Sequence, residues 1–199
     1  MQARNPDQRQ VDHVARLLAD GAVIIFPTDT IYAIGCSLYN RKGIETICRM
    51  LNKKPEKANL SIICSDLKHI SDYTLQFNSA TFKLLKHHLP GPFTFILKAN
   101  NEVPKLFLSN KKTIGIRVPD NKIARGLVEA LGHPLVSSSI HSEDGIQQFL
   151  TEPEEIYQAF MHKVDVIIDG GAGSNEPSTV VDCTGEVPEI IRQGMGVIS

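Results

Sequence analysis

The chain has 199 residues, of which 42% are hydrophobic and 22% are charged, and its formal net charge is -1. This length suits one globular domain with a sizeable core, and the composition excludes a low-complexity or disordered chain. No apolar run approaches the roughly 18 residues of a membrane-spanning helix, and the polar residues 1–10 lack the apolar core of a signal peptide. We therefore expect a soluble, cytoplasmic protein with a single domain over residues 1–199.

Hydrophobic patterning in the first half predicts helices that alternate with buried strands. Apolar residues at helical spacing predict a helix between Pro6 and Gly21, and the β-branched run that follows predicts a strand buried on both faces. The turn that follows is PTDT. Further predicted elements are an extended segment at 31–36, a helix at 42–51, a strand at 60–64 and a helix at 81–88.

In the second half, strands at 93–97 and 113–118 flank a polar, basic connection. Asp120 is expected to cap a helix that ends at Gly132. The remaining predicted elements are a strand at 135–138, a helix at 153–160, and strands at 164–168, 179–181 and 189–192. Several neighbouring strands lack an intervening helix, so the pattern predicts a mixed α/β sheet and not a doubly wound fold. There is no linker and no internal repeat.

The near-zero net charge hides an asymmetry along the chain. Residues 81–125 hold nine Lys and Arg against two acids, and residues 142–199 hold two against eleven. A further basic segment spans 41–57. Separate basic segments that converge on one surface would attract a polyanion or a phosphate-bearing ligand, whereas dispersed ones would be solvated faces.

Thiol and metal chemistry are not expected. Cys36, Cys48, Cys64 and Cys183 lie far apart without a CxxC pair, which is typical of reduced, buried thiols in a chain of this length. The seven histidines lack ligand spacing with the cysteines, so no protein-bound metal is predicted.

The dinucleotide and P-loop glycine signatures are absent, and the glycines at 170–173 are typical of a flexible turn. Polar side chains instead follow predicted strands, where α/β proteins commonly place their sites. Two hydroxyls and a carboxylate occupy 28–30, and three serines and an imidazole lie within 137–141. Thr94 follows a turn fixed by two prolines.

Seven segments together resemble the YrdC/YciO family in the order that the family has them. They span nearly the whole chain: PTDTIYAIG (27–35), KKPEKANLSII (53–63), PGPFTFIL (90–97), IGIRVPD (114–120), PLVSSSIH (134–141), STVVD (178–182) and IIRQG (190–194). Each alone is weak, and their order makes the resemblance specific. Known members of this family include L-threonylcarbamoyladenylate synthases.

The resemblance implies a single-domain α/β fold with a twisted mixed sheet, flanking helices and a concave basic cavity. It also implies the substrates ATP, L-threonine and bicarbonate, assistance by Mg²⁺, and threonylcarbamoyl-AMP and pyrophosphate as products. The adenylate would feed tRNA modification. Because the protein has little covalent work in such a reaction, positioning and cationic stabilisation of phosphate charge should supply most of the rate.

The family motifs assign catalytic roles to Lys53, Lys54 and Arg117, the last as a planar fork for a carboxylate or phosphate. Because Arg117 ends a strand, its truncation is expected to leave the fold intact. Substrate- or nucleotide-binding roles fall on Thr30, Thr94, Ser137, Ser139, His141, Ser178, Thr179 and Arg192.

The chain departs from the synthase motifs at two places and there looks more like the YciO branch. Asn52-Lys53-Lys54-Pro55 replaces Lys-x-Arg-Pro, and Ser139-Ile140-His141 replaces Ser-x-Asn. An alternative function is therefore a double-stranded or structured RNA-binding module of the same fold without efficient catalysis. An acyltransferase or a nucleotide-binding regulator on this scaffold also stays open.

Overall fold

The computed structural model describes residues 6–105, 112–140 and 149–199. Its helices are α1 (Gln8–Ala19), α2 (Arg41–Met50), η1 (Pro55–Lys57), α3 (Leu67–Ser71), α4 (Ser79–His88), α5 (Lys122–Leu131) and α6 (Pro153–Phe160). Its strands are β1 (Val23–Phe26), β2 (Ala33–Ser37), β3 (Ser61–Ile63), β4 (Phe93–Lys98), β5 (Thr113–Arg117), β6 (Leu135–Ser139), β7 (Val166–Ile167), β8 (Thr179–Asp182) and β9 (Glu189–Arg192). Every predicted helix and strand is present, and η1 and α3, each too short for a periodic pattern, were not predicted.

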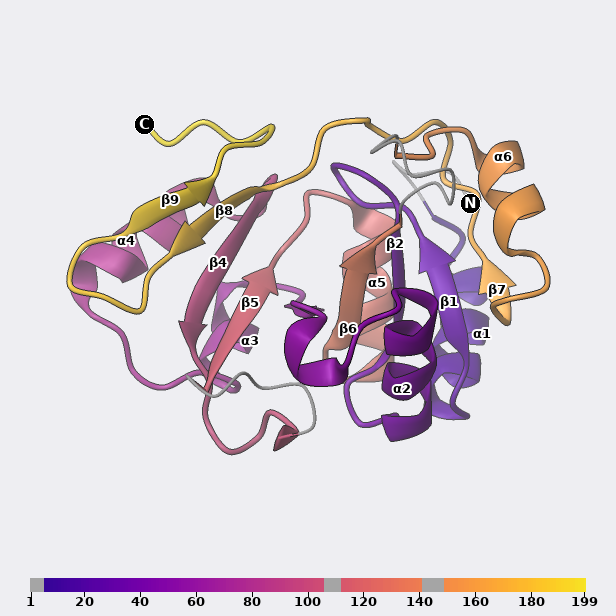
Figure 1. Ribbon diagram of the computed structural model, residues 1–199, viewed down its shortest axis with the longest axis horizontal. Coiled ribbons are helices and arrows are strands. Elements are labelled where there is room, and N and C mark those ends of the chain that lie inside the picture. Colours follow the sequence, from indigo (N-terminus) through magenta and orange to yellow (C-terminus); the bar gives the residue numbers. More distant parts are fainter. Residues whose placement is uncertain (1–5, 106–111, 141–148) are drawn as a thin grey trace.

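One nine-stranded sheet runs through the molecule in the order β7-β1-β2-β6-β3-β5-β4-β8-β9. The pairs β1–β7, β3–β5 and β4–β8 are parallel, and the other pairs are antiparallel. This arrangement confirms the predicted mixed sheet. The sheet twists strongly from one edge to the other, and helices flank it (Figure 1).

The helices divide between the two faces of the sheet. Residues of α1 and α5 pack together against one face, where Ile24, Phe26, Ile63 and Leu135 belong to the same apolar cluster. Residues of α2, α3 and α4 belong to the cluster on the opposite face, which continues into β4 and β5. None of the helices in the described residues has the length and apolar character that crossing a membrane requires.

Side chains cap the starts of α1, α2, α3, α4 and α5, whereas α6 and η1 have no side-chain cap. At α5 the capping residue differs from the predicted one. The cap of α5 is Asn121 and not Asp120, because the Asn121 side chain accepts hydrogen bonds from the backbone of Ile123 and Ala124. The backbone N–H of Asp120 is instead directed to Asp29. The helix ends at Gly132 in the left-handed conformation, with φ of 81°, as glycine allows.

The four cysteines are all buried, as predicted. Burial raises the pKa of the Cys36 and Cys183 thiols to about 12. These thiols therefore stay protonated near neutral pH, which agrees with a structural role and not with a nucleophilic one.

Strand register places a row of small residues across the middle of the face that α1 and α5 partly cover. Gly35 of β2 lies opposite Ser137 of β6, Ser137 lies opposite Ser61 of β3, and Ser61 lies opposite Gly115 of β5. Because residues opposite each other in a ladder point to the same face, these four positions form one continuous row of small residues, which we call the floor. Bulky apolar partners such as Ile62, opposite Ile116, occupy the other face.

Candidate functional site

The turn between β1 and β2 is held rigid by its own hydroxyl groups. Thr28 Oγ1 donates to the carbonyl of Ile31 at 2.8 Å and accepts the backbone N–H of Thr30 at 3.1 Å. The two threonine hydroxyl oxygens lie 3.1 Å apart. Both side chains are buried, Thr30 almost completely, at 1% exposure. The turn thus presents hydroxyl oxygens in fixed positions.

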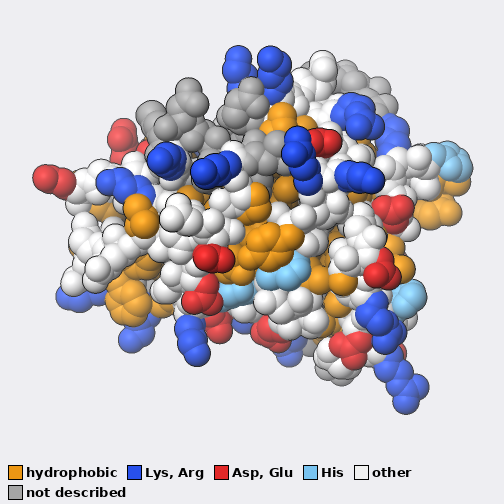
Figure 2. Space-filling view, turned by 90° about the horizontal axis from the view of Figure 1, so that it is seen from below, with side chains coloured by type: hydrophobic (Ala, Val, Ile, Leu, Met, Phe, Trp, Pro, Cys, Tyr) orange, Lys and Arg blue, Asp and Glu red, His pale blue; other side chains and the backbone are white. Residues whose placement is uncertain are grey.

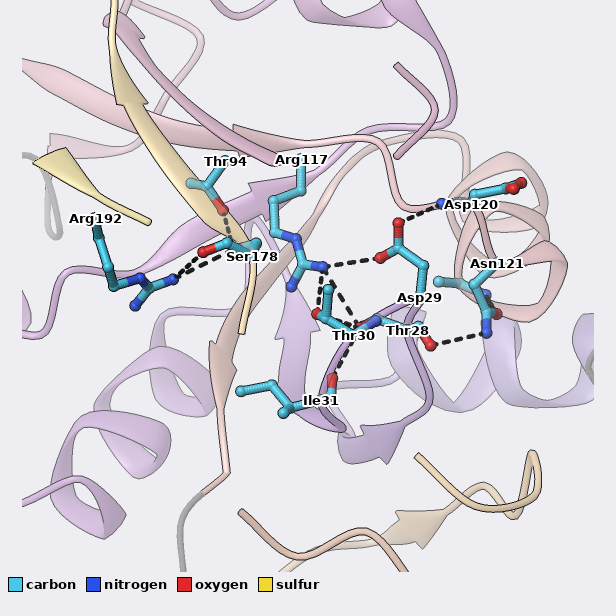
Figure 3. A network of polar contacts seen from close by, with 11 residues as sticks. Thr28, Asp29, Thr30, Ile31, Thr94, Arg117, Asp120, Asn121, Ser178 and Arg192 are labelled. Atoms are coloured by element: carbon cyan, nitrogen blue, oxygen red, sulfur yellow. Dashed lines mark hydrogen bonds and ion pairs between the residues drawn. The ribbon is translucent and has the colours of Figure 1, made fainter. Parts of the chain in front are cut away.

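Arg117, the last residue of β5, binds this turn. Its Nη2 donates to Thr30 Oγ1 at 2.8 Å and to Asp29 Oδ1 at 3.0 Å, and Thr28 Oγ1 lies 3.5 Å from the same nitrogen. The side chains of the Arg117–Asp29 ion pair are only 6% and 9% exposed. Figure 3 shows the guanidinium lying against the turn, between it and Ser178.

The same turn is joined to the start of α5. Asp29 Oδ2 accepts the backbone N–H of Asp120 at 2.9 Å, and Asn121 Nδ2 donates to the carbonyl of Thr28 at 3.3 Å. Asn121 therefore caps its helix with its oxygen and holds the turn with its nitrogen. The β1–β2 turn thus meets a segment that is distant in sequence, which runs from the end of β5 to the start of α5.

A second polar group lies beside the first on the same face of the sheet. The hydroxyls of Thr94 and Ser178 are 2.8 Å apart, and Arg192 Nη2 donates to the Ser178 carbonyl at 2.7 Å and to its hydroxyl at 3.3 Å. Val180 lies opposite Thr94 in one ladder and opposite Arg192 in the next. Thr94 and Arg192 therefore share the face that carries Gly115 and Arg117.

The electrostatics of this face favour an anion. Burial lowers the pKa of Arg117, Asp29 opposes this shift, and the positive charge of Arg192 adds to it. Burial also lowers the pKa of Arg192. The Nε atom of Arg117 is buried and makes no hydrogen bond within the described residues. Two guanidinium groups that repel each other across a partly buried face would be stabilised by a bound carboxylate or phosphate.

The structure brings together most of the predicted site residues. Arg117 contacts Thr30 directly, and Thr94, Ser178 and Arg192 form the adjoining group. Ser137 and Ser139 lie on the same sheet face through the β2–β6 register. Ser137 is buried, and its hydroxyl oxygen lies 3.5 Å from the Ser61 carbonyl.

Thr179 is placed differently from its predicted neighbours. It lies opposite Phe93, on the other face of the sheet from Thr94, and its exposure is 0%. Its Oγ1 donates to the carbonyl of Gly196 at 2.6 Å and accepts the backbone N–H of Gly194 at 3.0 Å. The Thr179 hydroxyl thus fastens the segment after β9, and Ser178 alone of the two reaches the polar face.

Lys53 and Lys54 lie on the exposed segment between α2 and η1. Within the described part of the chain, neither side chain makes a hydrogen bond or ion pair. Lys and Arg side chains gather along the upper edge of Figure 2, which corresponds to the front of the view in Figure 1, where α2 lies. The exposed basic residues of α2 and η1, with the connection between them, are Arg41, Lys42, Arg49, Lys53, Lys54 and Lys57. His141 lies outside the described residues.

Two residues of this site, Ser61 and Gly115, were not indicated by the sequence, and Thr28 and Asp29 were noted as polar residues of the turn but given no role. The position of Asp29 between two threonines after a buried strand was a usable signal for it. Gly115 could be found only from the register, since a Cβ there would lie 2.8 Å from Ser61 Oγ and 3.2 Å from Thr94 Cγ2. A side chain at this position would therefore raise the floor beside Arg117.

No group of three or more His, Cys, Asp or Glu side chains that could hold a metal ion occurs among residues 6–105, 112–140 and 149–199. Both carboxylate oxygens of Asp29 are already engaged. Two pockets, of about 430 and 290 Å³, lie elsewhere, beside Phe82 and Tyr39. The concave basic cavity over the polar face thus stays a prediction.

The family model Sua5/YciO/YrdC, described as "Telomere recombination", matches residues 16–194. Escherichia coli YciO is 42% identical over 193 residues, which is 96% of this chain and 92% of that protein. The crystal structure of E. coli YciO has a TM-score of 0.92 at 39% identity and covers 100% of this chain and 95% of its own.

Two more distant relatives extend the comparison. A threonylcarbamoyl-AMP synthase from Coxiella burnetii is 26% identical over 181 residues, which is 90% of this chain and 96% of that enzyme. The structure of P. abyssi Sua5 complexed with L-threonine has a TM-score of 0.87 at 24% identity, covering 96% of this chain and 55% of that one. The latter likeness concerns the fold alone.

Proposed function

The chain belongs to the Sua5/YciO/YrdC family, and on this premise we propose that it is a threonylcarbamoyladenylate synthase-like nucleotidyltransferase. Its substrates would be ATP, L-threonine and bicarbonate, and its product would serve tRNA modification. The relationship to the Coxiella burnetii synthase supports this reaction class. The observation that carries the proposal is the pair Arg117 and Arg192 on one polar sheet face, with a buried Arg117 Nε that has no hydrogen-bond partner among the described residues.

The proposed reaction has two steps. The threonine amine first attacks bicarbonate, and loss of water gives a carbamate. A carbamate oxygen then attacks the α-phosphorus of ATP, and the bond between that phosphorus and the bridging oxygen breaks. Threonylcarbamoyl-AMP forms, and the electron pair leaves with pyrophosphate. Fixed cationic donors are the most useful protein contribution to such a transfer, because charge spreads over several phosphate oxygens in the transition state.

The geometry suggests how the side chains share this work. Arg117 would hold a carboxylate or phosphate, and Arg192 would neutralise a neighbouring phosphate charge. The hydroxyls of Thr30, Thr94 and Ser178 would orient polar groups of the ligand. The small floor would leave room for the ligand beside these groups. Ser137 of the floor and Ser139, farther along β6 on the same face, are the predicted ligand-facing serines.

Mg²⁺ would enter with the nucleotide, as part of the substrate. The described residues offer no set of carboxylates for a cage, and Asp29 is occupied by Arg117 and the Asp120 backbone. Magnesium commonly keeps several waters and binds through substrate phosphates, so the hydroxyl-rich face suits this mode. When bound, the ion would neutralise phosphate charge.

The reaction should be slower here than in a synthase with the complete motif. Lys54 carries one charge at a single point, whereas the arginine of the family motif presents a planar fork that matches two phosphate oxygens. Loss of one preorganised donor typically costs about 2.7–4 kcal/mol of transition-state stabilisation.

The test is pyrophosphate release with ATP, L-threonine and bicarbonate, each omitted in turn. We expect release only when all three are present, and loss of release in Arg117→Lys, which removes the fork but keeps a charge. Arg16→Lys on α1, an exposed arginine outside the polar network, is the matched control and should match the parent. Release that does not require threonine or bicarbonate would contradict the proposal.

A second candidate function is binding of structured RNA, which the exposed basic residues of α2 and η1 favour. Affinity through phosphates should fall steeply between about 50 and about 200 mM salt, because binding releases counterions. Joint replacement of Lys53, Lys54 and Lys57 by Glu should weaken binding of a double-stranded RNA. Lys83→Glu with Lys86→Glu on α4 is the control. Equal loss in both variants would indicate nonspecific attraction and argue against this function.

A further inference from the structure

Asp29 occupies the junction of the polar network. Its Oδ1 accepts Arg117 Nη2 at 3.0 Å, and its Oδ2 accepts the backbone N–H of Asp120 at 2.9 Å. The carboxylate is thus shared between the end of β5 and the entry to α5. It is nearly buried, since only 9% of the side chain is exposed. The sequence motifs did not assign a role to Asp29.

Arg117 needs such a partner because its side chain is long and flexible. An arginine side chain has many rotamers, and it loses this freedom when it is fixed. Among the contacts of the described residues, Nη2 is the guanidinium nitrogen that binds the turn, through Asp29 and the two threonine hydroxyls. The Nε atom has no partner in the described residues, and the second terminal nitrogen has no dashed contact in Figure 3.

The charge of Asp29 distinguishes it from the two threonines. A hydrogen bond between ionised groups is roughly twice as strong as one between neutral groups. The threonine hydroxyls also contact each other, and Thr28 Oγ1 donates to the Ile31 carbonyl. Asp29 is therefore the acceptor that fixes how the guanidinium lies against the turn.

We propose that Asp29 is a positioning residue that locks Arg117 in one orientation and ties it to the start of α5, leaving the remaining N–H groups of the guanidinium for an anionic group of the ligand. This inference rests on the proposed function, in which Arg117 binds a carboxylate or phosphate. Asp29 itself does not touch the ligand. A purely structural residue would change the stability of the fold without changing how Arg117 is held.

The experiment compares Asp29→Asn with Asp120→Asn. Asn at position 29 keeps the shape and removes the charge. Asp120 is the matched control, because its side chain is 73% exposed and, within the described part of the chain, reaches only Arg125, at 3.7 Å. Its contribution to the network is the backbone N–H, which the substitution retains. Asp29→Glu retains the charge and serves as the second variant if Asp29→Asn does not fold.

The first readout needs no substrate. Nitrogen-15 NMR of arginine side chains reports rotation of the terminal NH₂ groups, and Arg117→Lys identifies the Arg117 signals. The parent and Asp120→Asn should show separate, slowly exchanging Arg117 protons, and these should merge in Asp29→Asn. Asp29→Glu should lie between the two. Fast rotation in the parent, or slow rotation in a folded Asp29→Asn protein, would overturn the proposal.

The second readout is the KM for ATP and for L-threonine in pyrophosphate release. We expect Asp29→Asn to raise one KM by about tenfold, which corresponds to about 1.4 kcal/mol, while Asp120→Asn matches the parent. Unchanged values for both substrates would overturn the proposal. A parent that holds Arg117 rigidly but releases no pyrophosphate would contradict the proposed function and leave the positioning of Arg117 supported by the NMR result.

Discussion

Arg117 and the segment at 52–57 are both cationic regions of the predicted site, and they differ in how the fold holds them. Arg117 is 5% exposed, and its Nη2 lies against acceptors on Thr28, Asp29 and Thr30. Lys53 and Lys54 are exposed, and their side chains make no hydrogen bond or ion pair within the described part of the chain. A buried, oriented charge can stabilise a transition state without reorganising, whereas mobile surface charges mainly attract an anion from a distance.

The largest expected effect on stability comes from Arg117→Ala. From the sequence we expected little loss of stability. The structure increases the expected loss, because truncation would leave the Asp29 carboxylate buried without its Arg117 partner. Breaking a buried pair typically costs about 3–5 kcal/mol. Urea unfolding should show this loss, and Arg117→Ala with Asp29→Ala should lose less. Additive losses in the double variant would mean that the pair is not coupled.

A smaller loss is expected from Gly115→Val on the floor beside Arg117. The Cβ alone would lie 2.8 Å from Ser61 Oγ and 3.2 Å from Thr94 Cγ2, and overpacking of this kind typically costs about 1–3 kcal/mol. Calorimetry with ATP should also show weaker binding, because the branched side chain would rise into the proposed ligand space. Gly185→Val is the control, since the nearest atom to a Cβ there is 3.8 Å away. Equal ATP affinity in the two variants would show that the floor is not part of the ATP-binding site.

Substitutions in the segment at 52–57 should change stability through backbone strain and not through the loss of side-chain contacts. Asn52 has a positive φ of 51°, which asparagine tolerates and most side chains resist by roughly 1–2 kcal/mol. Asn52→Lys, which restores a family lysine, should lower stability by about this amount, and Asn52→Gly should not. Thermal unfolding measures both. A stable Asn52→Lys protein would show that this turn is not strained.

Restoring the complete motif tests the catalytic side of the same region. Asn52→Lys, Lys54→Arg and His141→Asn together should raise the rate of pyrophosphate release by about tenfold or more, provided the triple variant folds. Single changes can show little, because residues that act at one site are not additive. If the triple variant binds ATP as the parent does and gains no rate, the departures from the motif do not limit the chemistry.

The smallest effect on stability should come from Lys53→Ala and Lys54→Ala. Because both side chains are exposed and lack partners in the described residues, each change should stay within about 0.5 kcal/mol in urea unfolding. A larger loss from either substitution would show that the lysine is held by the fold, and the contrast with Arg117 would fail.

The fold was largely predictable because buried strands and amphipathic helices leave periodic patterns in the sequence. The turn at 27–30 and the strand that ends at Arg117 were both found in this way. The ion pair between them was not, since Asp29 and Arg117 are 88 positions apart and only the strand order brings them together. The prediction of Thr179 beside Ser178 overlooked strand alternation, which directs neighbouring residues to opposite faces.

The most direct test is calorimetry of ATP binding in the presence of L-threonine, on the parent, Arg117→Lys and Lys54→Ala. It shows whether the buried, oriented charge of Arg117 contributes more to ligand binding than the exposed charge of Lys54. We expect Arg117→Lys to weaken binding by about tenfold or more, or about 1.4 kcal/mol, because a lysine cannot replace the fork that Asp29 and the threonines orient. Lys54→Ala should bind within about threefold of the parent, as an exposed charge that is not oriented contributes only about 0–1 kcal/mol. Equal affinity of Arg117→Lys and the parent, together with a larger loss in Lys54→Ala, would contradict the account.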